Sequence, residues 1–387
     1  MSTSVNANKP IHTYSVWFGS DPEIFIADQK GLVMGSESVV PKDGIITPQG
    51  GYGKVVRDGV QVELHPFPST CRQSHSLGIA FCLQTLKDAC KPKEYSISFR
   101  PVVDMDPMVF EGLTEDSKRL GCAPSLNAYD VTASIYPEGG SYLTRSAGGH
   151  IHLGLLHGFK DESQWKKSYA PSYPLPYVFQ HRERLVPLLD ILVGNTAVLF
   201  DRDPYAAKRR EVYGRAGEYR LPDHGIEYRT LSNFWLHSVA LYSLMFALAR
   251  QAVGVLHTEG TGLANTWGAA DELLRLVDVE KVQKAINTND VELAWHNFEG
   301  VRKFIHDHCS SVTHCHSSGL LREHLTKFEK VAKRVQADGL TAVWPSSPME
   351  VWSEMNSQTY TRPFGWESFI SAFDPSAKST SNSSMSL

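Results

Sequence analysis

The stretch GSDPEIFIAD, residues 19–28, shows the pattern on which the fold of this chain depends. Side chains two residues apart on a β-strand point to the same face of the sheet. Asp21 and Glu23 therefore share one face, whereas Ile24 and Ile26 point to the other face and fill a core. The stretch predicts a strand with one apolar face and one face that carries carboxylates.

Three later stretches repeat this arrangement with other polar pairs. They are DGVQVELHP at 58–66 with Gln61 and Glu63, GGHIHLG at 148–154 with His150 and His152, and GIEYRTL at 225–231 with Glu227 and Arg229. Burying a carboxylate costs several kcal/mol unless a cation or a partner compensates. A sheet face that gathers these side chains is therefore typical of a site for metal ions and a polyanion rather than of a core.

Composition limits the possible classes of protein. Of the 387 residues, 42% are apolar and 21% are charged, which favours a sizeable core over global disorder. The net charge of -4 argues against nucleic acid as the main partner. The six cysteines show no CxxC spacing and the start MSTSVNANKP does not resemble a signal peptide, so we expect free thiols in a reducing cytoplasm.

The order of the predicted elements favours an α+β fold. Turn signals divide residues 14–66 into short strands, and strand signals crowd the first two thirds of the chain, whereas helical periodicity fills the last third. This order predicts an antiparallel sheet covered by helices rather than a βαβ fold. The apolar stretch 235–256 contains His237, Arg250 and Gln251, so it is interpreted as a buried helix and not as a membrane span.

We expect one catalytic domain between two unstructured ends. The predicted parts are a flexible N-terminus at 1–13, a domain at 14–373 with a sheet-rich core at 14–236 and mostly helices at 237–373, and a disordered tail at 374–387. Helices are predicted at about 70–90 and 180–199, and helical periodicity extends over 271–338.

The polar residue types leave more than one site chemistry open. Carboxylates with one imidazole suit Mg²⁺ or Mn²⁺ better than Zn²⁺. Two histidines on one strand face would also suit zinc in a hydrolase, built on His150, His152 and Glu63. The stretch HDHCSSVTHCH at 306–316 is a second candidate for zinc, although its spacing fits no standard finger and a polar helix–loop junction explains it equally.

An arginine block precedes the last strand of the pattern. Arg215 and Arg220 lie in GRAGEYRLP, and Arg229 follows. A solvated basic face is one interpretation, but guanidinium groups also bind phosphate oxygens in a bidentate manner. The chain has no GxxxxGK[ST], no GxSxG and no GxGxxG after a strand, so P-loop, serine hydrolase and Rossmann interpretations have no support.

Taken in order, these segments resemble the glutamine synthetase and glutamate–cysteine ligase superfamily, and most closely its phage and bacterial COOH–NH2 ligase type 2 (amidoligase) branch. SDPEIF looks like the first acidic strand of that branch, DGVQVELHP the second, and RSAGGHIHLG the histidine strand. RREVYGRAGEYRLPDHGIEYRTLSNFWL looks like its arginine–glutamate signature. The resemblance covers about residues 18–236 and departs from the larger enzymes in having Asp at position 21 instead of Glu.

The resemblance implies a glutamine synthetase-like sheet that forms a catalytic cup, and an ATP-dependent ligase that makes an amide bond through an acyl phosphate. It implies ATP and Mg²⁺ (or Mn²⁺) as cofactors. The implied metal ligands are Asp21, Glu23, Glu63, His150 and Glu227. The implied catalytic and phosphate-binding arginines are Arg215, Arg220 and Arg229, with His152 as a further phosphate-binding residue, and Arg145 and Asn127 are candidates for binding substrate.

Three other functions remain open at this point: a kinase of the same fold, the metal-dependent hydrolase, and a non-catalytic virion or binding protein. For the ligase, the expected partners are small-molecule or peptide carboxylates and amines, without nucleic acid or membrane. The resemblance to a phage family implies a phage origin, and therefore that the protein acts in the host cytoplasm. Glutamine synthetases form rings, but no residue pattern here requires an oligomer.

Overall fold

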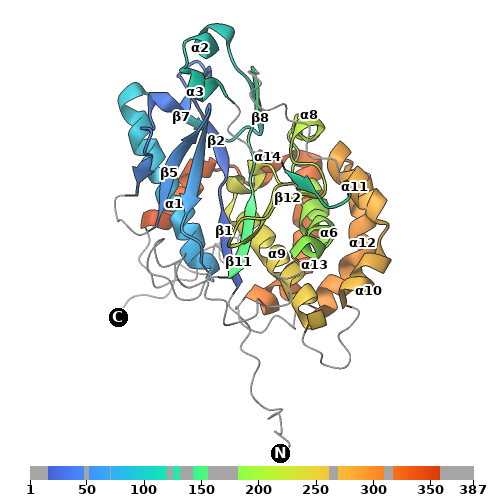
Figure 1. Cartoon of the computed structure of the whole chain (residues 1–387). Coiled ribbons are helices and arrows are strands. Elements are labelled where there is room, and N and C mark those ends of the chain that lie inside the picture. The colour runs from blue at the N-terminus through green and yellow to red at the C-terminus, as the bar shows by residue number, and fades with distance from the viewer. Residues whose placement is uncertain are drawn as a thin grey trace, which may run out of the picture.

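The computed structural model describes residues 16–47, 52–69, 71–119, 125–130, 143–155, 182–260, 269–308 and 317–357. In this part of the chain every strand lies between residues 16 and 228, and all strand pairs are antiparallel. Helices pack around these strands (Figure 1). The α+β class predicted from the sequence is therefore confirmed. The expected flexible N-terminus at 1–13 and disordered tail at 374–387 lie outside the described residues.

The strands form two larger sheets and one small pair. The first sheet has the order β1 (Val16–Ser20), β11 (Ile151–Leu155), β13 (Gly225–Tyr228), β12 (Glu218–Arg220) and β9 (Leu126–Asn127). The second has the order β3 (Val33–Met34), β2 (Glu23–Ala27), β6 (Gln61–Pro66), β5 (Gly53–Asp58) and β4 (Ile45–Ile46), and β7 (Ser96–Ser98) also pairs with β2. A separate pair joins β10 (Thr144–Ser146) to β8 (Val102–Asp104).

Asp21 and Pro22 connect the two sheets. They follow β1 at the edge of the first sheet and precede β2 inside the second. The Glu23 amide donates to the Gly148 carbonyl at 2.8 Å, so the start of β2 is also bonded to the segment that leads into β11. The polar faces of the two sheets therefore adjoin at this connection.

The alternation predicted for the four polar strands is present. Ile24 and Ile26 of β2, and Ile151 and Leu153 of β11, are fully buried in the main core. Phe25, on the same face of β2 as Glu23, instead belongs to a second, smaller core with Val103 and Phe110. The carboxylate face of β2 is thus not polar along its whole length.

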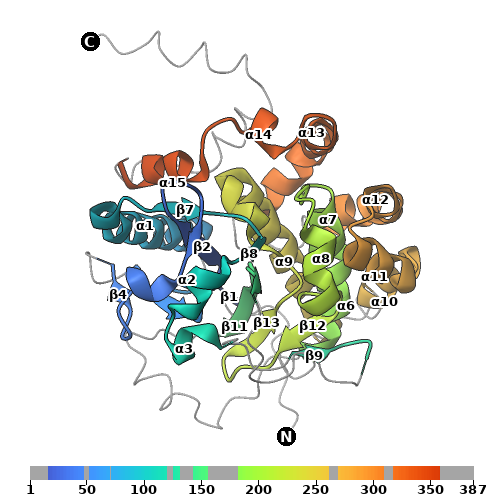
Figure 2. The ribbon, with the colours of Figure 1, turned by 90° about the horizontal axis from the view of Figure 1, so that it is seen from above.

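The helices cover the sheets from both ends of the molecule. The longer and core helices are α1 (Arg72–Cys90), α6 (Leu185–Leu189), α7 (Asn195–Val198), α8 (Ala206–Val212), α9 (Val239–Gly260), α10 (Ala269–Leu276), α11 (Val279–Thr288), α12 (Val291–His308), α13 (Ser317–Asp338) and α15 (Pro348–Ser357). The remaining short helices are η1 (Ser36–Ser38), η2 (Lys91–Lys93), α2 (Pro107–Glu111), α3 (Glu115–Lys118), η3 (Arg182–Arg184), η4 (Asp190–Gly194), η5 (Asn233–His237) and α14 (Leu340–Val343). Figure 2 shows α1 and α15 at one end and α10, α11 and α12 at the other, with α9 and the five-stranded sheet between them.

The predicted helix at 180–199 is interrupted by a π-helical turn. α6 and α7 flank η4, a π-helix over Asp190–Gly194, and all five of its residues are buried. π-helical turns inside α-helices often mark functional or strained positions. Here the Asp190 carboxylate accepts a hydrogen bond from Tyr228 Oη at 2.6 Å, which ties this turn to the core side of β13.

The apolar stretch at 235–256 is the central helix of the fold. By length and composition alone, residues Val239–Leu256 of α9 are apolar enough to cross a membrane. In the structure 83% of this window is buried inside the protein, against helices α6, α10 and α13 among others. The interpretation as a buried helix is confirmed, and Cys82 and Cys90 are free thiols as expected.

A buried histidine joins α1 to the strand that leads into the acidic connection. His75 Nδ1 lies 2.9 Å from Tyr242 Oη and its Nε2 lies 3.3 Å from Ser20 Oγ. Burial lowers the pKa of His75 to about 3. The folded state therefore holds the neutral imidazole, whereas the unfolded chain takes up a proton as the pH falls below the ordinary value of 6.5.

We expect this histidine to make the fold sensitive to acid. Its contribution to stability is complete above pH 6.5 and is lost as the pH falls towards 3. One pKa unit corresponds to about 1.4 kcal/mol, so the loss at pH 5 is roughly 2 kcal/mol. Urea unfolding at pH 7.5 and pH 5 should show a smaller pH dependence for His75→Gln than for the wild type. The exposed His296→Gln serves as the control, and an unchanged pH dependence in His75→Gln would contradict the prediction.

Candidate metal and phosphate site

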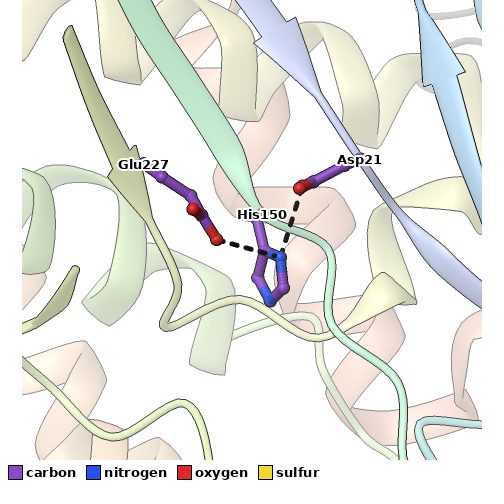
Figure 3. Close-up of side chains that lie close together, drawn as sticks. All are labelled: Asp21, His150 and Glu227. Carbon is purple, nitrogen blue, oxygen red and sulfur yellow. Dashed lines mark ion pairs between the residues drawn. The ribbon is translucent and has the colours of Figure 1, made fainter. Parts of the chain in front are cut away.

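Three of the predicted metal ligands meet where the two sheets adjoin. Asp21 lies in the connection after β1, His150 immediately precedes β11, and Glu227 lies in β13 (Figure 3). His150 Nδ1 is 3.2 Å from Asp21 Oδ1 and 3.5 Å from Glu227 Oε1, and one ligand atom from each residue lies within 4.8 Å of the other two. β11 runs between β1 and β13, which is why its histidines face acids from both neighbours.

The donor atoms of this trio fit a divalent cation. Asp21 Oδ1, His150 Nδ1 and Glu227 Oε1 are buried, and none of them makes a hydrogen bond within the described part of the chain. Their neighbours are one another and Arg229, as ion pairs at 3.0 to 3.5 Å. The three atoms converge on one point, where a cation would contact all of them. Two carboxylates and one imidazole suit Mg²⁺ or Mn²⁺ better than Zn²⁺.

The second sheet adds three carboxylates to the same region. Glu23 of β2 lies directly opposite Glu63 of β6, and Val56 of β5 is the next neighbour of Glu63 in register. Asp58 lies two residues after Val56 and so shares the face of Glu63. Glu23 Oε2 accepts a hydrogen bond from the Gly148 amide at 2.7 Å, whereas Glu63 Oε2 pairs with His65 Nε2 at 2.8 Å. These two predicted ligands have protein partners of their own.

The carboxyls of this region have pKa values shifted in opposite directions, upward for Glu63 and Asp58 and downward for Asp21. Burial raises the pKa of Glu63 well above its ordinary value, and the charges of Asp21, Asp58 and Glu23 raise it further. Burial and the charge of Glu23 likewise raise the pKa of Asp58 to about 6. Burial opposes ionisation of Asp21 as well, but His152 and His150 outweigh it and hold the pKa of Asp21 well below its ordinary value.

The burial of the Asp58 carboxyl, together with this repulsion, predicts that Asp58→Asn stabilises the protein when no metal is bound. The raised pKa means that the charged carboxyl destabilises the folded state above pH 6, and that this cost disappears as the pH falls towards the ordinary value of 3.8. The gain should reach at most about 3 kcal/mol at pH 7.5. Thermal or urea unfolding in EDTA at pH 7.5 and 4 measures it, with the exposed Asp43→Asn as control. Equal stability of Asp58→Asn and wild type at pH 7.5 would show that the acids do not repel one another.

Arg229 is the most tightly held of the predicted phosphate-binding residues. Its Nε lies 3.0 Å from Glu227 Oε1, its Nη1 donates to Ser125 Oγ at 2.9 Å, and its Nη2 donates to Tyr213 Oη at 2.7 Å. Only 1% of the residue is exposed. Arg220 lies opposite Glu227 in register, with its Nη1 3.7 Å from Glu227 Oε2, and keeps more of its side chain exposed.

The contacts that Arg215 makes are with residues other than Asp21, His150 and Glu227. Its Nη2 donates to the Glu211 carbonyl at 3.1 Å on the exposed side of α8. Its backbone carbonyl accepts from Thr230 Oγ1 at 2.9 Å. In this conformation Arg215 stabilises the segment between α8 and β12, and its predicted role in binding phosphate stays a prediction.

His152 lies beside the trio, held between an acid and a second histidine. Its Nε2 is 3.0 Å from Asp21 Oδ2, and its Nδ1 is 3.0 Å from His224 Nε2. Burial opposes protonation of His152, but the Asp21 carboxylate outweighs it and raises the pKa of His152. The raised pKa of His152 favours its cationic form, which suits the predicted contact with phosphate.

The two predicted substrate-binding residues are both engaged with the protein. Arg145 is 1% exposed, donates to the Lys118 carbonyl and lies over the Phe110 ring in the smaller core. Asn127 Nδ2 donates to the Ala216 carbonyl at 2.9 Å. Asn127 Oδ1 accepts from the Tyr129 amide at 2.9 Å. These contacts give both residues a structural role, and their contact with substrate stays a prediction.

The glycines before the histidine strand make room for protein groups. The position of these glycines in the sequence suggests that the backbone approaches a ligand closely. The structure gives another reason for the absence of side chains here. A Cβ atom on Gly148 would lie 2.1 Å from His150 Nε2, and one on Gly149 would lie 2.3 Å from the Ser232 carbonyl oxygen. Gly148 therefore accommodates the imidazole of the site itself.

Helices of the last third hold the arginine segment in place. Asn287 Oδ1, at the end of α11, accepts from the Ala216 amide at 2.8 Å. Asn289 Oδ1 accepts from Arg210 Nη1 at 2.8 Å, and its Nδ2 donates to the Asp201 carbonyl at 2.9 Å. Asn289 has φ +52 and ends the helix in the left-handed region, which asparagine tolerates. The helical third thus stabilises the segment that carries Arg215.

Three residues of the site were not predicted from the sequence: Asp58, Tyr213 and His224. Asp58 is in RDG, which reads as a turn, and its place on the face of Glu63 depends on the register of the hairpin. Tyr213 and His224 lie outside the strands, and only the folded chain brings them to His150 and His152. A polar residue directly before a turn glycine, as Asp58 precedes Gly59 at the tip of this hairpin, is too common to single out one acid.

The sequence offers two zinc interpretations, the hydrolase and the stretch at 306–316, and the structure bears on only the first of them. Among the described residues, the group of acids and histidines at metal-binding distance is Asp21, His150 and Glu227. A zinc hydrolase built on His150, His152 and Glu63 would need all three residues in one group, and this group contains only His150 of the three. The candidate at 306–316 falls on residues 309–316, which lie outside the described ranges, and on helix residues whose side chains are likewise not described.

Comparison with known families supports the predicted resemblance for one part of the chain. Residues 178–261 match a family model described as "Phage phiEco32-like COOH.NH2 ligase-type 2". The match contains Arg215, Arg220, Glu227 and Arg229, and it confirms the resemblance to this family of carboxylate–amine ligases for that segment. Asp21 and the other acids of the first 66 residues lie outside it. No curated protein matches the chain.

Two solved structures show a weak likeness to the whole fold. "GmaS/ADP complex-Conformation 1" is 13% identical, with 75% of this chain and 70% of that chain covered and a TM-score of 0.29. A bifunctional glutathione synthetase from Pasteurella multocida is 11% identical, with 87% of this chain and 55% of that chain covered and a TM-score of 0.32. TM-scores of this size do not define a shared fold.

Proposed function

We propose that this chain is an ATP-dependent carboxylate–amine ligase that forms an amide bond through an acyl phosphate. The observation that carries this proposal is the trio of Asp21, His150 and Glu227, whose ligand atoms lie within 4.8 Å of one another directly beside Arg229 and Arg220. A cation site that adjoins two guanidinium groups suits a polyphosphate held by metal and arginine together. The family match over residues 178–261 supports the ligase class.

The proposed active site is a cup formed by the polar faces of the two sheets. The first sheet supplies His150, His152 and Glu227, and the second supplies Glu23, Asp58 and Glu63, with Asp21 at the connection between them. Their apolar neighbours on each strand point into the main core, which fixes the direction of the polar side chains. Strand positions are suited to this task because they hold side chains more precisely than loops do.

Asp21, His150 and Glu227 would hold Mg²⁺ or Mn²⁺, and Glu23 and Glu63 lie close enough in register to extend the set. When bound, the metal supplies positive charge that offsets the charge of the phosphates and of the transferring phosphoryl group. The residues present fit this role because five carboxylates gather here, and burial together with their mutual repulsion raises the pKa of Glu63 and Asp58.

The reaction needs two displacements. An oxygen of the substrate carboxylate attacks the γ-phosphorus of ATP, and the bond to the β,γ-bridging oxygen breaks with release of ADP. The amine then attacks the carbonyl carbon of the acyl phosphate, phosphate leaves with the bonding electrons, and a carboxylate of the site accepts the ammonium proton. In the first step the guanidinium groups of Arg229 and Arg220 stabilise the negative charge of the phosphoryl oxygens.

Turnover in the presence of Mg²⁺ tests this function. The protein is mixed with ATP and a panel of amino acids, peptides and peptidoglycan fragments, first as carboxylates alone and then with amines. We expect ADP formation that requires both substrates, and an amide product heavier than the carboxylate by the mass of the amine minus water. ADP with a phosphorylated product and no amide would identify a kinase instead. If no pair of substrates leads to ADP or to any other consumption of ATP, the result would contradict a ligase for these substrates.

Metal dependence separates this proposal from a binding protein that merely keeps the fold. EDTA should abolish ADP formation and excess Mg²⁺ should restore it, because the acids of the trio cannot hold a polyanion without a cation between them. ATP and Mg²⁺ are both abundant in cytoplasm, which is the compartment that we propose, with small carboxylates and amines as partners.

A further inference from the structure

Tyr213 lies between two arginines at the end of α8. Only 3% of the residue is exposed, and it follows the last residue of the helix as its C-cap. The guanidinium carbons of Arg209 and Arg229 lie 4.7 and 4.9 Å from the centre of its ring, which is within the range of cation–π contacts. The ring is therefore held by its position in the chain and by both arginines.

Arg209 attaches this end of α8 to the strand that carries Glu227. It donates to the Thr230 carbonyl at 3.1 Å and to the Leu231 carbonyl at 2.9 Å, just beyond β13. Gly214, which follows Tyr213, has φ +76, and a Cβ there would lie 2.1 Å from Arg209 Nη1. The chain can thus turn closely around the guanidinium, and Tyr213 keeps a fixed place relative to β13.

The hydroxyl of Tyr213 contacts the nitrogen of His150 that points away from the acids. Tyr213 Oη lies within hydrogen-bonding distance of His150 Nε2, and the two rings meet edge to face. The absence of a side chain on Gly148 leaves room for the imidazole in this orientation. Nδ1 is consequently the nitrogen that faces Asp21 and Glu227.

We infer that Tyr213 is a positioning residue that orients His150 towards the cation site and thereby sets its affinity for a divalent metal. When Nδ1 faces a cation, Nε2 carries the proton and donates it to an oxygen, which fixes the tautomer and the plane of the ring. The Tyr213 oxygen is in place to accept it. This inference rests on the proposed function only in requiring that the trio of Asp21, His150 and Glu227 takes a divalent cation.

The same oxygen joins the cation site to the proposed phosphate clamp. Arg229 Nη2 donates to Tyr213 Oη at 2.7 Å, and Arg229 Nε lies 3.0 Å from Glu227 Oε1. His150, Tyr213, Arg229 and Glu227 therefore form a closed ring of polar contacts. Removing the hydroxyl opens this ring on one side, and His150 and Arg229 then stay linked through Glu227 Oε1 on the other.

Mn²⁺ binding to the full chain without nucleotide tests the inference. Titration followed by the electron paramagnetic resonance signal of free Mn²⁺ measures affinity directly, without turnover. Tyr213→Phe keeps the ring and both cation–π contacts, and we expect it to bind Mn²⁺ about 10- to 100-fold more weakly than the wild type. Tyr242→Phe is the matched control, because this buried phenol contacts His75 and not the cation site, and its Mn²⁺ affinity should be that of the wild type.

A double-mutant cycle distinguishes positioning from a general loss of structure. In a His150→Ala background, Tyr213→Phe should cause no further loss of Mn²⁺ affinity, whereas a structural defect would weaken both backgrounds equally. Gly148→Ala approaches the same contact from the other side, since its methyl group displaces the imidazole and leaves the phenol intact. It should also weaken Mn²⁺ binding, even where Tyr213→Phe fails to fold.

The possible failures are distinguishable. Wild-type affinity in folded Tyr213→Phe or in Gly148→Ala would overturn the role of Tyr213 and leave the proposed ligase untouched. Equal losses from Tyr213→Phe in the wild-type and His150→Ala backgrounds would also overturn it. If the wild type itself binds no Mn²⁺, the cation site of the proposed function fails, and the inference fails with it.

Discussion

Glu227→Gln is expected to lower kcat by about a thousandfold while the protein still folds. Its Oε1 faces His150 Nδ1 and Arg229 Nε, and its Oε2 faces Arg220 Nη1. The substitution removes a metal ligand and also leaves a buried guanidinium without its carboxylate, which costs about 3–5 kcal/mol in comparable pairs. That cost lowers the stability of the folded protein. The loss in rate comes from the missing support for charge in the transition state, and removal of one such group costs about two to three orders of magnitude in kcat.

The measurement is ADP formation in the coupled reaction, with saturating Mg²⁺ and the substrate pair identified in the screen. Glu272→Gln on the exposed side of α10 is a matched control, because it makes the same change of charge far from the site. Circular dichroism and the unfolding midpoint establish that the variant is folded. Wild-type turnover in folded Glu227→Gln would remove this carboxylate, and with it the trio, from the mechanism.

Arg229→Lys is expected to have the second largest effect, because a lysine cannot reproduce the three directions in which this guanidinium donates. Arg229 contacts Glu227, Tyr213 and Ser125 at once, and an ammonium on a flexible stem can satisfy few of these contacts together. We expect a loss in kcat/KM for ATP of about a hundredfold, of the size found when a donor to a developing oxyanion is removed. A lower unfolding midpoint should accompany it, because Glu227 Oε1 loses its 3.0 Å contact with the guanidinium Nε.

Arg302→Lys supplies the comparison for this variant. Arg302 on α12 also pairs with a glutamate, Glu329 at 2.6 Å, but its side chain is 44% exposed and distant from the acids. Surface ion pairs of this kind contribute about 0–1 kcal/mol, so Arg302→Lys should leave both turnover and stability nearly unchanged. Equal effects of the two substitutions on kcat/KM would show that Arg229 acts through general stability and not at the phosphates.

Much of the fold followed from local patterns along the chain. Alternation of Ile24 and Ile26 with Asp21 and Glu23 predicts which side chains enter the core, because the period of a strand is a local property. The same reasoning held for His150 and His152. The apolar run at 235–256 predicted the central helix, and its burial in the structure, rather than its composition, distinguishes it from a membrane span.

Other parts of the site depend on the register between strands and on loop geometry. Asp58 joins the acids only because the β5–β6 hairpin places it two residues beyond the neighbour of Glu63. Arg145 has the charge of a substrate-binding residue, yet its side chain ends in the smaller core against Phe110. The positions of Asp58 and Arg145 could not be predicted from their residue types. Both positions depend on which distant segment of the chain packs against each residue.

Residue order alone determined that this chain has strands with one apolar and one polar face, that helices follow them, and which acids, histidines and arginines are available for chemistry. Those properties come from periods of two and 3.6 residues and from side-chain chemistry. Tertiary structure alone decided which of these side chains meet. Asp21, His150 and Glu227 are more than seventy residues apart in the chain, and antiparallel pairing of β1, β11 and β13 brings their donor atoms within 4.8 Å.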